Sequence, residues 1–419
     1  MSTVKGHSAA FLLPTFAHSA ITKGTEPNSR SQAATILGEC RTPMPTWTYD
    51  ADGLIQAAAQ KQIKHPCEYV SAKSELGDLH GHVDITNGRN KSLLRLAYGT
   101  YIDCSRWNAL SAFERFQLQI KALVKPGSGT IITGEAAAAL HGIPLLVRNA
   151  TIALANSGLR RPGGGLRHVG GKILEQDIVR IGGRCVTDVP KTVIDVCRTS
   201  ESENGPIVVD TALRQWCDLE ELRTVFTNYP RSPGTRRARE LLRTASEHSE
   251  TIGESITKKC IIDSGIATLY DEKCVLMQQV EFYDSEGFIG RVDFYVPHLN
   301  LIIEFDGLTK YSGGGVAATE TVLLKEQARE KRLRNLHLDV LRFQWSQVIN
   351  GDCVEVLRQF AIRQRQRIQA GGLVFSSEVG RFRQATVPYK DRQLRESRIQ
   401  ERKQRLQLLE NAPASRDSG

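Results

Sequence analysis

The sequence lacks the signatures of several protein classes. Nine cysteines are scattered over 419 residues, and no two of them form a C-x-x-C pair. Their odd number and irregular spacing argue against a disulfide framework and against a structural zinc site. No run of eighteen apolar residues occurs, and the first twenty residues hold only a short apolar patch after a single lysine. We therefore expect no membrane span, no secretion signal and an intracellular, cytoplasmic protein.

Positive charge, in contrast, is in excess. Lys and Arg number 55 against 46 Asp and Glu, which gives a formal net charge of +9 and a pI near 9.1. Such an excess favours a polyanionic partner, although many basic proteins bind no nucleic acid. The chain is 40% hydrophobic and 24% charged, as globular proteins are. A chain of 419 residues is too long to fold around one compact hydrophobic core, so two or three domains are expected.

Changes of pattern along the chain predict five segments of an α+β protein. Residues 1–50 are rich in Ser, Thr, Pro and Ala without a sustained period, which is typical of a flexible lead-in. Residues 51–110 read as helix, helix and hairpin, the order of a winged helix. Residues 111–229 alternate helices with short strands and Gly-rich loops in a small αβ domain. Residues 230–370 predict a mixed αβ domain, and residues 371–419 a basic helical tail.

The winged-helix segment carries candidate DNA contacts. Helices are expected over residues 54–64 and 71–79, followed by a hairpin that turns at Gly99. Lys91 and Arg95 precede this turn, so they are expected at a helix end and on the wing, where cations contact phosphates. The alternative is a winged helix that serves only protein contacts.

The last globular segment is predicted in more detail. Three strands are expected, then a helix, a fourth strand and a final helix, over residues 275–287, 290–296, 300–307, 320–336, 338–345 and 346–370. The basic tail that follows carries only a thin Leu/Ile stripe. A stripe that thin predicts a solvated helix.

Carboxylates stand among apolar residues in GRVDFYVPHLNLIIEFDGLTKY, residues 290–311. Glu304 and Asp306 project from one side of a strand, and a hairpin through PHLN would bring Asp293 beside Glu304. Glu254, on the preceding helix, is expected to point toward the same place. Burying unpaired carboxylates costs several kcal/mol, so converging acids favour a hard divalent cation such as Mg²⁺. Each acid alone is equally typical of an outward edge-strand or turn residue.

The motif RVDFYVP, LIIEFDG, KY, EQAREKRL and DVLRFQW resembles the endonuclease-like domain related to very-short-patch-repair enzymes, in the PD-(D/E)xK superfamily. The resemblance spans roughly residues 250–350 and implies a restriction-endonuclease-like αβα fold acting on DNA. It makes Asp293 the motif's Asp, Glu304 its second acid and Glu254 the helix Glu. It also places Arg329 on the helix that follows, as a DNA contact.

One position departs from the superfamily pattern. Asp306 stands two residues after Glu304, where the superfamily has a lysine. Lys310, in the next turn, is the candidate to replace that lysine and to steady charge on a phosphate. Asp293 and Glu304 are then the expected catalytic metal ligands, with Asp306 as a further ligand or water anchor.

Residues 54–215 are similar to the AbiEi family of type IV antitoxins, through LLRLAYGTYID, ITGEAAAALHGIPL, CVTDVPKTVIDVCR and VVDTALR. That resemblance implies a winged helix before a small αβ domain, with DNA and a cognate toxin as partners. Within ITGEAAAALHGIPL, Thr133 is expected to cap a helix that carries Glu135 in its first turn. His141 is interpreted as a buried helix-end residue rather than a catalytic one.

Three functions are thus predicted in order. The first is a Mg²⁺-dependent endodeoxyribonuclease that hydrolyses phosphodiester bonds and is targeted by the winged helix. The second is a DNA-binding regulator of antitoxin type that keeps the nuclease fold as a platform without cleavage. The third is a protein-interaction scaffold that binds no nucleic acid.

Overall fold

A computed structural model describes residues 93–97, 100–156, 166–170, 173–199, 203–230, 232–307 and 316–410, together with two short strands, β1 (Trp47–Tyr49) and β2 (Ile55–Ala57). Most of the expected lead-in lies outside these residues, as do Lys91, Lys310 and most of the two expected winged-helix helices. Twelve α-helices and three mixed or antiparallel sheets occur among the described residues, so the protein is α+β as expected. No helix in this part of the chain has the length and apolarity to cross a membrane.

The first sheet has the strand order β1-β2-β4-β3. Strands β3 (Leu93–Ala97) and β4 (Thr100–Asp103) are antiparallel, which confirms the predicted hairpin. The helix expected from residue 54 is wrong at Ile55–Ala57, which forms β2 and pairs with both β1 and β4. A short apolar run is compatible with either a helix or a strand. Here hydrogen bonding to a neighbouring strand on each side makes these residues a strand.

The middle sheet has the order β7-β6-β5-β9-β8 and mixes parallel with antiparallel pairs. Its strands are β5 (Ile131–Thr133), β6 (Ile152–Ala155), β7 (Leu166–Val169), β8 (Ile178–Ile181) and β9 (Arg184–Thr187). Two helices lead into it, α1 (Cys104–Ala109) and α2 (Ala112–Leu123). Helix α2 begins with a capping box between Ser111 and Glu114, which fixes where the helix starts.

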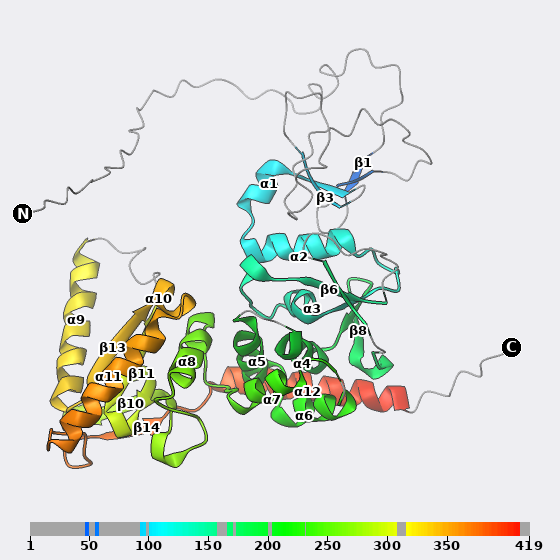
Figure 1. Ribbon diagram of the computed structural model, residues 1–419. Coiled ribbons are helices and arrows are strands. Elements are labelled where there is room, and N and C mark those ends of the chain that lie inside the picture. The colour runs from blue at the N-terminus through cyan, green and yellow to red at the C-terminus, as the bar shows by residue number, and fades with distance from the viewer. Residues whose placement is uncertain are drawn as a thin grey trace, which may run out of the picture. The chain divides into compact units, whose positions relative to one another are not determined.

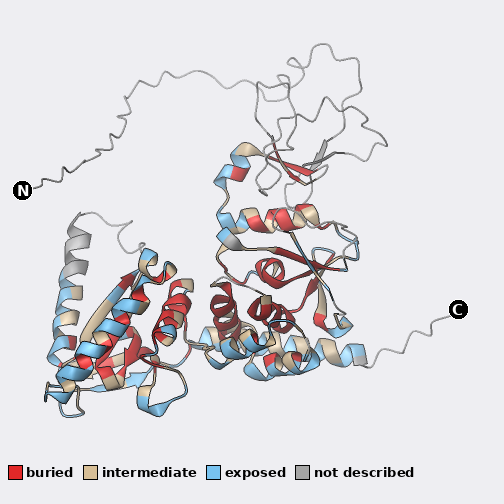
Figure 2. Cartoon of the chain, in the orientation of Figure 1, coloured by how far each residue is buried: buried red, intermediate tan, exposed pale blue. Residues whose placement is uncertain are grey.

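Five further helices complete this region: α3 (Gly134–Leu140), α4 (Val189–Thr199), α5 (Asn204–Gln215), α6 (Leu219–Asn228) and α7 (Thr235–Arg243). Helices α3, α4 and α5 are almost wholly buried (Figure 2). Thr133 stands at the N-cap of α3, but its expected capping bond is wrong. The Thr133 hydroxyl donates instead to Asp195 at 2.5 Å, because that buried carboxylate of α4 is the stronger acceptor.

The C-terminal sheet has the order β13-β12-β11-β10-β14, with only the β12–β13 pair parallel. Its strands are β10 (Met277–Asp284), β11 (Gly287–Val296), β12 (Leu301–Asp306), β13 (Asp339–Gln344) and β14 (Arg381–Gln384). The helices are α8 (Ile252–Ser264), α9 (Val316–Asn335), α10 (Trp345–Ile349) and α11 (Asp352–Gln369). The predicted order is confirmed up to the last helix, which is divided into α10 and α11 at Gly351, where φ is +79°.

Two apolar layers flank this sheet. Helices α8, α10 and α11 cover one face, where Ile256, Val348 and Leu357 pack on Phe294 and Ile303. The other face packs on Leu333 of α9 and on Leu336, which follows the end of that helix. Figure 1 shows α9 separated from α8 by the strands. The domain therefore has three layers, helix, sheet and helix.

A buried ion pair joins the middle region to this domain. Lys258 of α8 donates to the Asp210 carboxylate of α5, and both side chains are essentially inaccessible to solvent. Lys258 also donates to the Thr244 carbonyl at 2.6 Å, while Asp210 accepts from Ser249 Oγ at 2.9 Å. Burial lowers the pKa of Lys258, and the carboxylate of Asp210 opposes that change. The charges are compensated inside the protein rather than by water.

The tail helix α12 (Tyr389–Glu410) is helical as expected, but the expectation of a solvated helix is wrong. Its arginines bind the end of α5: Arg395, Arg398 and Arg402 donate hydrogen bonds of 2.5–3.0 Å to the carbonyls of Leu213, Gln215 and Trp216. The last carbonyls of a helix have no partner within the helix, and cations there also favour its negative end. Polar bonds, which an apolar stripe does not reveal, therefore dock this helix.

Removing one member of the buried pair leaves the other charge uncompensated. We expect Lys258→Met to lower the free energy of unfolding by about 3–5 kcal/mol, and Lys258→Met with Asp210→Leu to recover most of that loss. Urea unfolding measures both. Lys259→Met is the matched control, because its pair with Asp263 is exposed and should change stability little. Equal effects of Lys258→Met and Lys259→Met would contradict this account.

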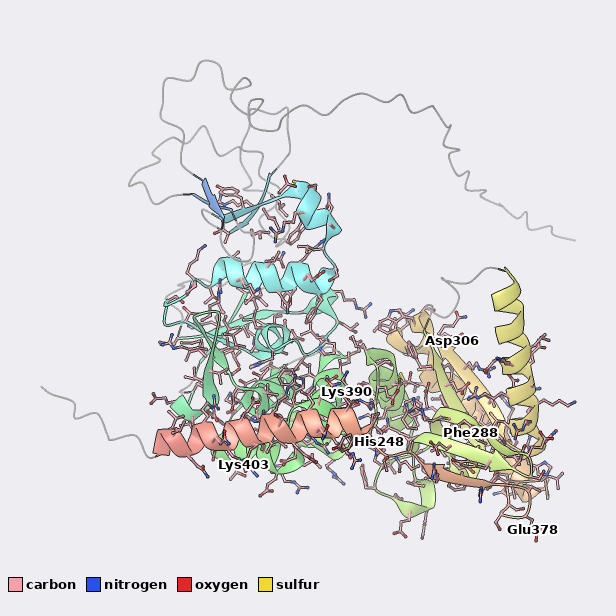
Figure 3. The ribbon with its side chains drawn as sticks, turned by 180° about the vertical axis from the view of Figure 1, so that it is seen from behind. His248, Phe288, Asp306, Glu378, Lys390 and Lys403 are labelled. Carbon is pink, nitrogen blue, oxygen red and sulfur yellow. The ribbon has the colours of Figure 1, made fainter. Side chains whose placement is uncertain are left out.

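The α12 contact makes a separate prediction. Arg402→Ala removes donors to the Trp216 carbonyl and to Glu221, and should cost about 1–3 kcal/mol of unfolding free energy. Lys403→Ala, one residue on and exposed on the same helix (Figure 3), should cost far less. A thermal melt of each variant measures the difference, and an Arg402→Ala melting temperature equal to wild type would show that the bonds of Arg402 do not stabilise the fold.

Candidate nuclease-like site

The strands that carry the predicted acids pair as expected. Strand β11 turns through Pro297–Leu299 into β12, with Phe294 opposite Ile303 and Val296 opposite Leu301. The predicted hairpin through PHLN is therefore confirmed. Asp293 and Glu304 stand just beyond these pairs, on adjacent strands.

Asp293 and Glu254 form one group of acids. The Asp293 carboxylate accepts the backbone N–H of Phe305 at 2.9 Å. Glu254, in the first turn of α8, accepts from the backbone N–H of Glu250 at 2.8 Å and from Gln279 Nε2 at 2.9 Å. Burial, and secondly the negative charge of Asp293, raise the pKa of Glu254 to about 7. Glu254 is thus a carboxyl group poised to hold a proton near neutral pH.

Glu304 has different neighbours. One of its carboxylate oxygens pairs with the Arg329 guanidinium of α9, and the other accepts from Arg342 Nε of β13 at 3.0 Å. Arg342 also donates to Glu326 at 2.7 Å and to Glu330 at 2.6 Å. The bond from Arg342 lowers the pKa of Glu330. We call these five residues the arginine–glutamate network.

Strand alternation separates Glu304 from Phe305, the next residue of β12. Glu304 faces α9, whereas Phe305 faces α8, where its ring lies so close to Gly253 that a Cβ there would stand 2.0 Å from it. Glu254 directly follows Gly253 in the first turn of α8. Glu304 therefore lies on the α9 side of the sheet and Glu254 on the α8 side, and the negative charge of Asp293 acts on Glu254.

The expected Mg²⁺ ligands do not fit this arrangement. Both oxygens of Glu304 accept from arginines, and one oxygen of Asp293 accepts from a backbone N–H. Among the residues that the structure describes, no three His, Cys, Asp or Glu side chains are placed to hold a metal ion together. Asp306 ends β12 and lies at the end of the sheet (Figure 3), with no side-chain hydrogen bond to another described residue.

The remaining predicted residues are distributed as follows. Arg329, expected to contact DNA, donates to Glu304, Glu326 and the Arg291 carbonyl. Arg95 lies on β3, where its Nε donates to the Ala97 carbonyl at 3.3 Å. Lys310, expected to act on a phosphate, follows the last described residue of β12.

Two residues of this site were not foreseen. Arg342 stands directly opposite Glu304 in the parallel β12–β13 register. Alternation in DVLRFQW could have indicated that side of the strand. Gln279 has a positive φ of 52°, which turns its amide toward Glu254 and leaves its own oxygen buried without a partner. The only signal for Gln279 was a pair of glutamines inside an apolar strand.

His141 lies at the end of a helix, as expected from the sequence. It is the C-cap of α3, and its Nε2 lies 2.7 Å from the Thr187 carbonyl. Burial lowers the pKa of His141 to about 4, so the ring is neutral at physiological pH and Nε2–H donates to that carbonyl. A neutral donor at the end of a helix stabilises the fold here.

The raised pKa of Glu254 predicts a pH dependence of stability. A carboxyl whose folded pKa is about 7, against an ordinary 4.5, stabilises the fold fully below pH 4.5 and loses that contribution as pH rises through 7. We expect the wild type to lose about 1–3 kcal/mol relative to Glu254→Gln between pH 5 and pH 8, in the presence of a chelator. Glu378→Gln, an exposed control, should keep the wild-type slope. Parallel urea titrations of wild type and Glu254→Gln would contradict the prediction.

Comparisons with known proteins add no family to this geometry. No family model matches the chain, and no curated protein or solved structure matches it either.

Proposed function

We propose that the chain is a DNA-binding regulator of antitoxin type, whose C-terminal domain uses a restriction-endonuclease-like αβα fold as a binding platform. The observation that carries this proposal is the pairing of Glu304 with both Arg329 and Arg342. DNA contact by the winged helix of residues 51–110 and contact with a cognate toxin belong to the same proposal.

The arginine pairing favours a platform over a catalytic centre. Hydrogen bonds between charged groups contribute about 1.5–3 kcal/mol each, and Glu304 has two such arginine partners. A divalent cation at Glu304 would have to displace at least one guanidinium, which would then lose its buried acceptor. The network instead holds α9 firmly against β12 and β13.

The fold and the charge support the DNA part of the proposal. The three-layer domain, with its hairpin of β11 and β12 and the parallel strand β13, agrees with the architecture that the sequence resemblance implies. A net charge of +9 favours binding to a polyanion, and such binding weakens as the salt concentration rises, because counterions released into concentrated salt gain less entropy.

Metal-dependent endonuclease activity is the second candidate, and one observation favours it. Glu254 and Asp293 are neighbouring acids in a largely buried place, and their repulsion contributes to the raised pKa of Glu254. Strongly perturbed carboxyl groups are concentrated at functional sites. This candidate requires Glu304 to leave its arginines.

One set of measurements on the full chain separates the candidates. We expect duplex DNA to bind with an affinity that falls steeply with salt, and supercoiled plasmid to remain intact in Mg²⁺ or Mn²⁺. Calorimetry should show no saturable Mg²⁺ binding.

The control is the double variant Asp293→Asn with Glu304→Gln. Metal-dependent nicking that this variant loses would establish the endonuclease and overturn the platform. Absence of any salt-dependent DNA binding by the wild type would overturn both candidates and leave the protein-interaction scaffold.

A further inference from the structure

A basic hollow lies away from the nuclease-like site, between α6, α7 and the segment before residue 271. It encloses about 490 Å³, and its lining includes Arg223, Phe226, Arg239, Arg243 and Tyr270. We call it the arginine groove. Cavities of this size accommodate a small organic ligand, and one nucleotide is of that class.

The charge of the groove is uncompensated. Arg223, Arg239 and Arg243 are exposed, and no carboxylate lines the cavity. No ion pair of these three arginines with another described residue lies within 4.0 Å, whereas Arg329, Arg342 and Arg402 each pair with a carboxylate. Arg236, another basic residue of α7, pairs with Glu240 and does not line the groove. Three clustered guanidinium groups without acids favour an anionic ligand.

Aromatic rings complete the groove. Tyr270 is 59% exposed, and the Arg243 guanidinium lies 5.0 Å from the centroid of its ring. Phe226 is half-buried, with Arg239 at 5.7 Å from its ring centroid. An exposed ring beside guanidinium groups can stack a planar base and bind the adjoining phosphate at the same time.

We propose that the arginine groove binds a nucleotide unit of single-stranded nucleic acid, with the base against Tyr270 and the phosphate among Arg223, Arg239 and Arg243. The inference rests on the proposed DNA-binding function and gives it a second, single-strand-specific contact surface. An acidic peptide could satisfy the same arginines but has no base to stack on an open ring. Stacking is therefore the property that identifies the ligand.

The test measures fluorescence anisotropy of full-length protein with a labelled dT decamer, and with an abasic decamer of equal charge. We expect the dT decamer to bind about 5- to 100-fold more tightly than the abasic decamer. Tyr270→Leu should remove that difference, whereas Arg239→Gln with Arg243→Gln should weaken both ligands and reduce the salt slope by about 1–2. Arg236→Gln, on the same helix but outside the groove, should behave as wild type.

Several results would overturn the inference. Equal affinity for the two decamers, or a difference that survives Tyr270→Leu, removes base stacking. Tighter binding of free dTMP than of the decamer reassigns the groove to a free nucleotide, and competition by an Asp-rich peptide that depends on the arginines but not on Tyr270 reassigns it to a peptide. Duplex binding without dT binding defeats the groove and leaves the proposed function intact. Binding of the dT decamer without binding of duplex DNA would support the groove and contradict the proposed binding of duplex DNA.

Discussion

The buried pair of Lys258 and Asp210 is the constraint on which the C-terminal domain depends. It ties α8 to α5, and the same two groups bind the Thr244 carbonyl and Ser249, so the segment between α7 and α8 is held at both ends. That segment ends at the N-cap of α8, one helical turn before Glu254. A charge pair of this kind contributes geometry more than net stability, because desolvation offsets most of its attraction. The position of Glu254 beside Asp293 follows from it.

At two other places arginine side chains join separate helices and strands through polar bonds. In the arginine–glutamate network, Arg329 and Arg342 connect α9, β12 and β13 through carboxylates. At the end of α5, the arginines of α12 supply donors to backbone carbonyls that the helix itself leaves unsatisfied. A planar guanidinium with five donors suits both tasks, since it can bind a carbonyl and a carboxylate together. The arginine groove stands apart because its guanidinium groups face solvent and rings instead of acids.

Local pattern was sufficient for much of the fold. Alternation identified β11 and β12 with their hairpin, and the Ser111 start of α2 is a sequence signal with a direct physical cause. The prediction was wrong where a distant partner decides: β2 is a strand through pairing with β4, and α12 docks through carbonyls of α5 some 180 residues earlier. The acids were placed on the correct strands, yet the partners of Glu304 come from α9 and β13. Neither periodicity nor composition encodes such long-range pairing.

The return of α12 to α5 gives the C-terminal domain the topology of an insertion. The chain leaves the middle region after α7, builds the sheet of β10 to β14, and comes back as α12 to the helix that Asp210 anchors. Both ends of the domain are thereby tied to one element, which restricts them as a closed loop does and lowers the entropy that this domain gains when it unfolds alone. A terminal domain on a single tether would open independently; an inserted domain with two tethers shares its unfolding with its host.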